Sequence, residues 1–309
     1  MKFRSIALAG ALALCAAQAQ AQDLTVGVTT TGVPFTFVDT GTQAPTGAMV
    51  DLAAAIAEDL EMTPNFAVTQ FSALIPALQT SKIDVISAGM FATDKRKEVV
   101  DFSSPVYSYG DAAFVAADDE GTYQIEDFAG EVIGAQIGTT FADQLQARGI
   151  FEEVKLYDSL VDIMRDVQLG RIKAGFGDKP IIAYQIAQNP NLGVKLVEGY
   201  TPMGIGEVAL AVSKDNPELL DKVNAAIAEM EQSGELAEIF GKEIGRDLIG
   251  RLHALGLIGT GPRSPRRGAP YTFVTTQGFL AAFGLESLAD LPDREMWEDA
   301  GLGSGGRGA

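Results

Sequence analysis

The chain alternates between stretches in which apolar residues have helical spacing and short runs that are apolar throughout. Residues 71–82 follow the first pattern, and Ser72 is placed to cap the helix that they predict. The apolar positions on one face of that helix are Leu74, Ile75 and Leu78. Residues 83–90, IDVISAGM, follow the second pattern, which is typical of a strand buried on both faces of a parallel sheet. We therefore expect a helix that ends near Ser81 and a buried strand directly after it.

The same order of helix end, turn and strand start occurs again 89 residues later. Residues 78–84 align with residues 167–173, and the strands that follow end at Gly89 and Asp178. Leu24–Thr29 and Val132–Ile137 have the apolar character of a leading strand for each half. A body of about 220 residues has room for two such α/β units. The pattern predicts two similar lobes whose strand ends face one another.

The predicted lobes divide the chain into segments. The chain is expected to cross between them near Tyr109–Val115 and again near Gly204–Leu210, where glycines favour a hinge. Lobe 1 is therefore discontinuous. The segments are residues 1–21 as a leader, 22–112 and 206–245 as lobe 1, 113–205 as lobe 2, and 246–309 as a separate tail.

A positively charged turn follows the predicted strand at residues 83–90. Phe91, Thr93 and Arg96 lie just past its carboxyl end, where open α/β sheets bind their ligands. The guanidinium of Arg96 can hold a carboxylate through two parallel hydrogen bonds. From spacing alone, Lys95, Arg96 and Lys97 fit equally well as a solvated cluster of charge on a turn.

The first 21 residues have the pattern of a secretory signal peptide. Lys2 and Arg4 precede an apolar run over residues 6–17, and residues 19–21, Ala-Gln-Ala, form a small-residue cleavage site. The run is too short to span a membrane stably. Cys15, the only cysteine, lies inside this segment, and Leu14 before it is too large for the usual lipoprotein pattern. We expect cleavage near Ala21 and an exported protein with neither a disulfide nor a lipid anchor.

Charge is distributed unevenly along the chain. Residues 22–245 carry 14 Lys and Arg against 34 Asp and Glu, a net charge of −20, whereas residues 246–309 carry seven of each. A strongly acidic body disfavours nucleic acids and anionic membrane surfaces as partners. The charge does not identify the ligand.

Five stretches, in order along the chain, resemble a known family. They are residues 32–35 (GVPF), 47–52 (GAMVDL), 71–105, 134–140 (GAQIGTT) and 175–180 (GFGDKP). Together they are similar to the family 3 solute-binding proteins, periplasmic receptors that supply ABC importers with polar amino acids and related zwitterions. The similarity spans about residues 24–243. It implies the α/β, two-lobed type II periplasmic binding protein fold, with two parallel or mixed sheets flanked by helices. It also implies a periplasmic monomer that binds a small zwitterion and meets an ABC permease in the inner membrane, with no cofactor.

The same resemblance assigns roles to the predicted site. It implies that Arg96 holds the ligand carboxylate and that Asp178 takes the positive nitrogen. Gly89 and Asp178, the expected ends of the two equivalent strands, are both predicted to contact the ligand. Taken alone, an Asp after a strand is more often a turn residue or a helix cap. Thr139 and Thr140 follow a buried strand and begin a helix, so their N–H groups suit an anion. Capping that helix is compatible with the same positions.

The chain departs from the family pattern at two positions. Many members have an aromatic residue where this chain has Gly32, and a hydroxyl where it has Phe91. Phe35, Phe71 and Phe91 can form an apolar cage for a weakly hydrated cation. That cage resembles members that bind ectoine, which makes an ectoine or hydroxyectoine receptor the alternative. An acidic residue expected at position 32 in that group is absent. Each phenylalanine, Phe71 first, can instead be ordinary core.

Other chemistry is sparse in the sequence. His253 is the only histidine and lies outside the body, so neither a Ser-His-Asp triad nor a histidine-based metal site is expected. We predict no catalytic residues and no enzyme activity. A periplasmic dehydratase on the same fold remains the alternative from another functional class.

The tail has a different character from the body. Residues 246–292 resemble the end of segregation and condensation protein B, a winged-helix partner of SMC complexes. The pattern predicts helices over residues 247–257 and 277–283 and a strand over Tyr271–Thr275. About 60 residues without the domain's first helices can hardly close a core. We interpret the tail as a partial winged-helix remnant of a fusion; a partner-binding or DNA-binding role is the alternative.

Overall fold

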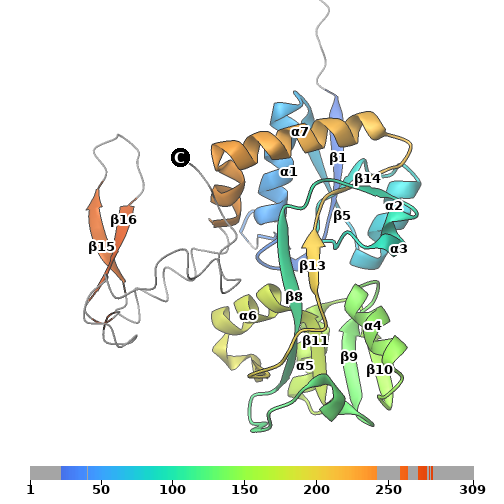
Figure 1. Cartoon of the computed structure of the whole chain (residues 1–309), viewed down its shortest axis with the longest axis vertical. Coiled ribbons are helices and arrows are strands. Elements are labelled where there is room, and N and C mark those ends of the chain that lie inside the picture. Colours follow the sequence, from blue (N-terminus) through green and yellow to red (C-terminus); the bar gives the residue numbers. More distant parts are fainter. Residues whose placement is uncertain are drawn as a thin grey trace, which may run out of the picture.

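The structure is a computed structural model that describes residues 22–39, 41–241, 258–263 and 271–276, together with residues 278 and 280. Its body is an α/β fold with two lobes, each built around its own sheet (Figure 1). The predicted signal peptide, residues 1–21, lies outside the described residues. No helix within the described ranges combines the length and the apolar character needed to cross a membrane.

The sheet of lobe 1 has the order β5-β1-β6-β14-β7. Strand β1 is parallel to β5 and β6, whereas β14 is antiparallel to β6 and β7, so the sheet is mixed. Helices α1 and α2 pack on it, and α7 contacts α1. A small sheet, β2-β3-β4, leads into α1. The bounds are β1 Asp23–Val28, β2 Thr31–Gly32, β3 Thr36–Val38, β4 Pro45–Thr46, α1 Ala48–Asp59, β5 Thr63–Val68, α2 Leu74–Gln79, β6 Val85–Ile86, α3 Asp94–Lys97, β7 Asp101–Phe102, β14 Ala211–Val212 and α7 Pro217–Ser233.

The sheet of lobe 2 has the order β10-β9-β11-β8-β12. Strand β9 is parallel to β10 and β11, and β8 is antiparallel to β11 and β12. Helices α4, α5 and α6 pack on this sheet. The bounds are β8 Tyr107–Ala116, β9 Val132–Gln136, α4 Thr140–Arg148, β10 Glu153–Tyr157, α5 Leu160–Gln168, β11 Ala174–Asp178, α6 Lys179–Gln188 and β12 Val194–Leu196.

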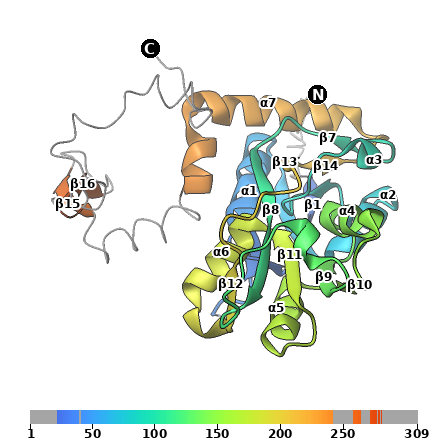
Figure 2. The same cartoon turned by 60° about the horizontal axis from the view of Figure 1, so that its bottom comes forward.

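Two antiparallel strands connect the lobes. β13, Ile205–Val208, pairs with the first part of β8, from Ile205 opposite Gly110 to Val208 opposite Tyr107. Figure 2 shows β8 and β13 side by side between the two sheets. Both crossover segments expected from the sequence contribute to this ribbon, since Tyr109 and Gly206 lie opposite each other within it. The lobe limits at residues 112 and 205 stay predictions.

The internal repeat is confirmed by the hydrogen bonds that end helices α2 and α5. Lys82 N–H bonds the Ala77 carbonyl, and 89 residues later Arg171 N–H bonds the Asp166 carbonyl, both at 2.9 Å. The residue before each donor has a positive φ, 53° at Ser81 and 66° at Gly170. This is the Schellman arrangement that stops a helix and turns the chain. It sends both chains into their next strand in the same way.

Equivalent glycines set the packing of each lobe. A Cβ at Gly27 of β1 would lie 2.5 Å from Ile83 Cδ1, and a Cβ at Gly134 of β9 would lie 2.7 Å from Ile172 Cδ1. Ile83 and Ile172 are themselves 89 residues apart. The glycines therefore leave room for matching isoleucines to pack across the leading strands, so both lobes bury the turn before the next strand in the same way.

Two local predictions for lobe 1 are wrong. Ser72 does not cap α2, because it lies inside a 3-10 turn over Phe71–Ala73 that precedes the helix. The strand expected over residues 83–90 is limited to Val85–Ile86, since Gly89 has a φ of 68° and bends the chain out of the sheet. That bend brings the segment toward the space between the lobes.

The tail contains one antiparallel hairpin in its described part. β15, Ile258–Arg263, pairs with β16, Tyr271–Thr275, with a register shift between Thr260 and Arg263. The strand predicted over Tyr271–Thr275 is confirmed. The helix predicted over residues 247–257, and most of the one over residues 277–283, lie outside the described residues.

Candidate functional site

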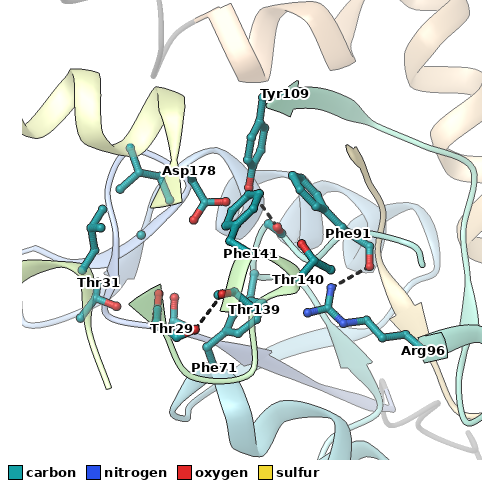
Figure 3. A pocket seen from close by; sticks show the side chains of 16 residues that line it. Thr29, Thr31, Phe71, Phe91, Arg96, Tyr109, Thr139, Thr140, Phe141 and Asp178 are labelled. Carbon is teal, nitrogen blue, oxygen red and sulfur yellow. Dashed lines mark hydrogen bonds between the residues drawn. The ribbon is translucent and has the colours of Figure 1, made fainter. Parts of the chain in front are cut away.

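A cavity lies between the two lobes, where strand ends from both sheets meet (Figure 3). Its volume is about 30 Å³, which is room for roughly one water. The lobes are therefore closed on each other, and a ligand of amino-acid size enters only if they separate. The lining residues are Thr29, Thr31, Gly32, Phe71, Ala88, Gly89, Phe91, Arg96, Tyr109, Gln136, Thr139, Thr140, Phe141, Leu160, Asp178 and Ile181.

Arg96 is buried at the edge of lobe 1. It sits in the short helix α3, whose N-cap Thr93 accepts a hydrogen bond from the Arg96 N–H. Its guanidinium donates to the Phe91 carbonyl at 2.8 Å and, across the cleft, to the Gly138 carbonyl of lobe 2 at 2.9 Å. Only 9% of Arg96 is exposed, whereas the neighbouring Lys95 side chain is 80% exposed. The solvated-cluster interpretation thus fits Lys95 and fails for Arg96.

The charge of Arg96 has no close counter-ion among the described residues. Burial lowers its pKa from the ordinary value, and the negative charges of Asp143 and Asp178 partly oppose that effect. Carbonyl oxygens accept its hydrogen bonds without neutralising it. A guanidinium has five N–H donors, so the two bonds leave donors for a further acceptor. The arrangement suits an anionic group in the cavity.

Asp178 is the negative group of the cavity and comes from lobe 2. It ends β11 and occupies the N-cap position of α6, yet its side chain makes no capping hydrogen bond. Burial raises the pKa of Asp178, while the nearby Tyr109 hydroxyl and the charge of Arg96 act in the opposite direction. Asp178 is partly exposed and lines the cavity, so its carboxylate is available to a cation there.

Tyr109 joins the two halves of the site and was not predicted as a site residue. It lies on β8, in the ribbon between the lobes, and its hydroxyl donates to the Gly89 carbonyl at 3.2 Å. Burial, and then the negative charge of Asp178, raise the pKa of Tyr109 well above its ordinary value. The phenol is therefore neutral and can act as a donor. Its place on the expected crossover was the only signal in the sequence.

Four aromatic rings line the cavity. The Phe91 ring lies 4.8 Å from that of Tyr109 and meets Phe141 edge-on at 5.6 Å. The Phe71 ring lies 5.6 Å from the Arg96 guanidinium carbon, so Phe71 is part of the site rather than plain core. Phe35, in contrast, is 1% exposed and does not line the cavity; it stacks on Tyr109 at 5.7 Å. The aromatic wall thus holds Tyr109 and Phe141 in place of Phe35.

The two threonines at the start of α4 differ in what they can offer a ligand. Thr139 is the N-cap: its hydroxyl accepts from Ala142 N–H, and both its hydroxyl and its N–H donate to the Gln136 carbonyl. Thr140 occupies the first helical position, where an N–H has no partner within the helix. The expected anion contact through an N–H is therefore open to Thr140 and not to Thr139.

All the predicted site residues except Phe35 thus line the same cavity. Arg96, Phe91, Phe71 and Gly89 come from lobe 1, and Thr139, Thr140 and Asp178 come from lobe 2. In the described ranges, no three His, Cys, Asp or Glu side chains are grouped as metal ligands are.

Comparison with known proteins places the body in a family. The sequence profile of the bacterial extracellular solute-binding proteins, family 3, matches residues 24–246. The arginine-binding periplasmic protein of Mannheimia haemolytica is 33% identical over 233 residues, which are 75% of this chain and 94% of that protein. The L-cystine-binding protein TcyJ of Escherichia coli (strain K12) is 30% identical over 227 residues, 73% of this chain and 84% of that protein.

Solved structures agree with the sequence comparison. An ancestral arginine-binding protein bound to glutamine superposes with a TM-score of 0.68 at 37% identity, covering 73% of this chain and 99% of the other. A second profile, that of the segregation and condensation complex subunit ScpB, matches residues 225–294 and overlaps the first at residues 225–246. In the structure, that overlap includes much of α7, which packs on lobe 1.

Proposed function

The chain belongs to the bacterial extracellular solute-binding proteins of family 3, and from this premise we propose that it is a periplasmic receptor for a small zwitterion. The ligand would be a polar amino acid or an amino-acid derivative. The receptor, a monomer freed of residues 1–21, would deliver the ligand to an ABC permease in the inner membrane. It would bind its ligand without transforming it.

One observation carries the proposal: a buried cation and a partly buried carboxylate, from different lobes, border the same cavity. Arg96 retains free donors for a ligand carboxylate, and Asp178 has an uncapped carboxylate for a ligand ammonium. A zwitterion would neutralise both charges at once. Buried charges are stabilised by such pairing and are costly without it.

Closure of the lobes provides the mechanism of capture. Arg96 and the exposed Lys95–Asp143 ion pair both bridge the lobes. A ligand held by Arg96 on one side and by Asp178 on the other would add to these contacts only when the lobes are closed. Ligand binding would thus shift the population from open to closed.

The binding test is a thermal-shift screen followed by calorimetry on the mature protein, residues 22–309. The screen contains the common amino acids, ectoine, hydroxyectoine and betaines. We expect at least one amino acid to raise the melting temperature with increasing concentration and to bind one to one, because a ligand of the folded state stabilises it. A screen without any shift contradicts the proposal.

An ectoine receptor is the second candidate, because four aromatic rings line the cavity and aromatic faces attract weakly hydrated cations. Stabilisation by ectoine or hydroxyectoine, and by no amino acid, supports that candidate. The screen also tests the enzyme alternative: the hits and a prephenate-like acid are incubated with the protein and followed by NMR. Turnover contradicts the role as a receptor, whereas unchanged ligand supports it.

For residues 246–309 we infer no independent function. The tail has equal numbers of positive and negative residues, whereas the body is acidic. A role as a partner of cytosolic condensin complexes also conflicts with an export signal. SMC-complex pulldown and a DNA mobility shift at low salt provide the test. Specific capture, or a salt-sensitive shift that the body alone does not produce, contradicts this inference.

A further inference from the structure

We propose that the cavity selects ligands without net charge and rejects amino acids whose side chains are cationic or anionic. The proposal rests on the function proposed above and narrows its substrate class. The relatives do not decide the matter, because their names include a receptor for cationic arginine and one for net-neutral cystine.

The charge inventory of the cavity carries the argument. Of its 16 lining residues, only Arg96 and Asp178 are charged, one of each sign. The backbone carboxylate and ammonium of any amino acid use both of them. A third charge, on the ligand side chain, would meet only neutral groups in a closed and largely apolar space.

Nearby neutral polar groups are largely occupied within the protein. The Thr29 hydroxyl bonds the Thr36 hydroxyl at 2.6 Å. Gln136 Nε2 donates to the Asp158 carbonyl at 2.9 Å, and Thr139 is used at the helix cap. These groups are therefore poorly placed to solvate an additional ion, whose transfer from water is costly unless it is paired.

Other carboxylates near the site do not supply the missing counter-charge. Asp158 and Glu207 each border a neighbouring groove, but both are exposed, and a cation that reached them would remain hydrated. Asp111 is fully buried and does not line the cavity; it accepts hydrogen bonds from the Tyr200 hydroxyl and the Met203 N–H, both at 2.7 Å. Asp143 pairs with Lys95.

The test compares ligands that differ in charge and little in shape. Calorimetry on the mature protein measures citrulline against arginine, norleucine against lysine, glutamine against glutamate, and asparagine against aspartate. We expect each charged member to bind at least about 100-fold more weakly than its neutral partner in every pair that binds. A charged member that binds within about tenfold of its partner, or more tightly, overturns the proposal.

This outcome is separable from failure of the proposed function. Preference for arginine over citrulline would overturn the charge selection and leave the receptor role intact. Binding of none of the eight amino acids would remove amino-acid binding itself, and the charge selection with it. The thermal-shift screen then shows whether another zwitterion binds.

Variants of the cavity wall give an independent measurement. Thr31 lines the cavity from β2 and is partly exposed, so Thr31→Asp adds a third charge at the wall. We expect T31D to reduce the preference for citrulline over arginine at least about tenfold, and T31N, its neutral control, to preserve it. Asp158→Asn should leave the preference unchanged. Arginine binding that is lost in D158N, or equal selectivity in T31D and T31N, overturns the proposal.

Discussion

At the scale of single residues, identical charges have different roles because their surroundings differ. Lys95 and Arg96 are neighbours in α3, yet the lysine side chain is exposed and the guanidinium faces the cavity. The lysine contacts Asp143 in water, where such pairs contribute about 0–1 kcal/mol. The arginine is shielded from water, so under the proposed function a contact with a ligand anion would have greater weight.

We therefore predict that Arg96→Ala weakens ligand binding by about 2–5 kcal/mol, the range for truncating one member of a buried charge pair. Lys95→Ala is the matched control and should change affinity by less than about 1 kcal/mol. Calorimetry with the best ligand of the screen measures both. Near-normal affinity in R96A would show that Arg96 does not contact the ligand.

Asp178 predicts how affinity depends on pH. Because burial raises its pKa above 3.8, Asp178 stays protonated to a higher pH than an ordinary carboxyl group. Only the ionised form attracts a ligand ammonium. Affinity should therefore fall as pH decreases through the raised pKa, and Asp178→Asn should bind weakly at all pH values with that dependence removed. A wild-type profile that is flat above pH 3.8 contradicts this role.

The stability of the ligand-free protein should respond in the opposite sense. A carboxyl group whose pKa is raised by folding stabilises the fold fully below its unfolded pKa, and this contribution is lost as pH rises through the folded pKa. In D178N residue 178 cannot ionise, so the folded state does not lose this stability as the pH rises. We expect its melting temperature without ligand, at neutral pH, to be at least that of the wild type.

At the scale of elements, the body continues past α7. Residues 235–241 are helical, and Leu236, Ile239 and Phe240 are buried. Phe240 stacks on Tyr107 with ring centroids 5.2 Å apart, and Tyr107 lies on the strand that connects the lobes. This helix is thus part of lobe 1, although it follows the C-capping Gly234 of α7.

Two truncations separate this helix from the tail. A chain that ends at Gly245 should keep its ligand affinity and its melting temperature, because it retains all three buried residues. A chain that ends at Gly234 should lose more than about 3 kcal/mol of unfolding free energy, the cost of removing one buried aromatic side chain. Thermal melts and calorimetry measure both. A large loss in the longer truncation product would show that the tail supports the body.

At the scale of the whole molecule, the two lobes approach each other closely at Gly138. Gly138, just before α4, has a φ of 81°, and a Cβ there would lie 3.0 Å from Ser72 Cα of lobe 1. Its carbonyl also accepts the hydrogen bond from Arg96. Backbone conformation and close contact therefore both favour glycine at this point of closure.

Gly138→Ala should weaken ligand binding, because the added methyl group holds the lobes apart. Gly149→Ala is the matched control: its φ is 63°, and a Cβ there has no neighbour within 4 Å. Both variants should lose about 1 kcal/mol of unfolding free energy to backbone strain. Calorimetry should show lower affinity in G138A alone. Equal affinities would show that this contact does not limit closure.

Local chemistry in the sequence was enough to predict much of this molecule. The alignment of residues 78–84 with 167–173 determined matching helix ends, because each turn needs only its own backbone bonds. It also identified Asp178 as a strand end, which is confirmed, whereas the strand expected to end at Gly89 stops at Ile86. Tertiary structure decided the rest. Phe71 lines the cavity and Phe35 is core, although Phe71 was the first of the two candidates for the core. Ser72 lies in a 3-10 turn, and Tyr109 and Phe141 also line the cavity.

The physical reason is that hydrogen bonds within a turn act over a few residues, whereas the orientation of a ring or carboxylate depends on packing between segments far apart in the chain. Apolar periodicity determined which segments are buried. A phenylalanine in the core and a phenylalanine at a cavity wall have the same place in that pattern, so the sequence does not distinguish them. Only the packing of segments far apart in the chain decided that Phe71 faces Arg96 and that Tyr109 reaches Gly89. The sequence by itself determined two lobes and one charged residue after a buried segment in each, and the tertiary structure decided which side chains meet between them.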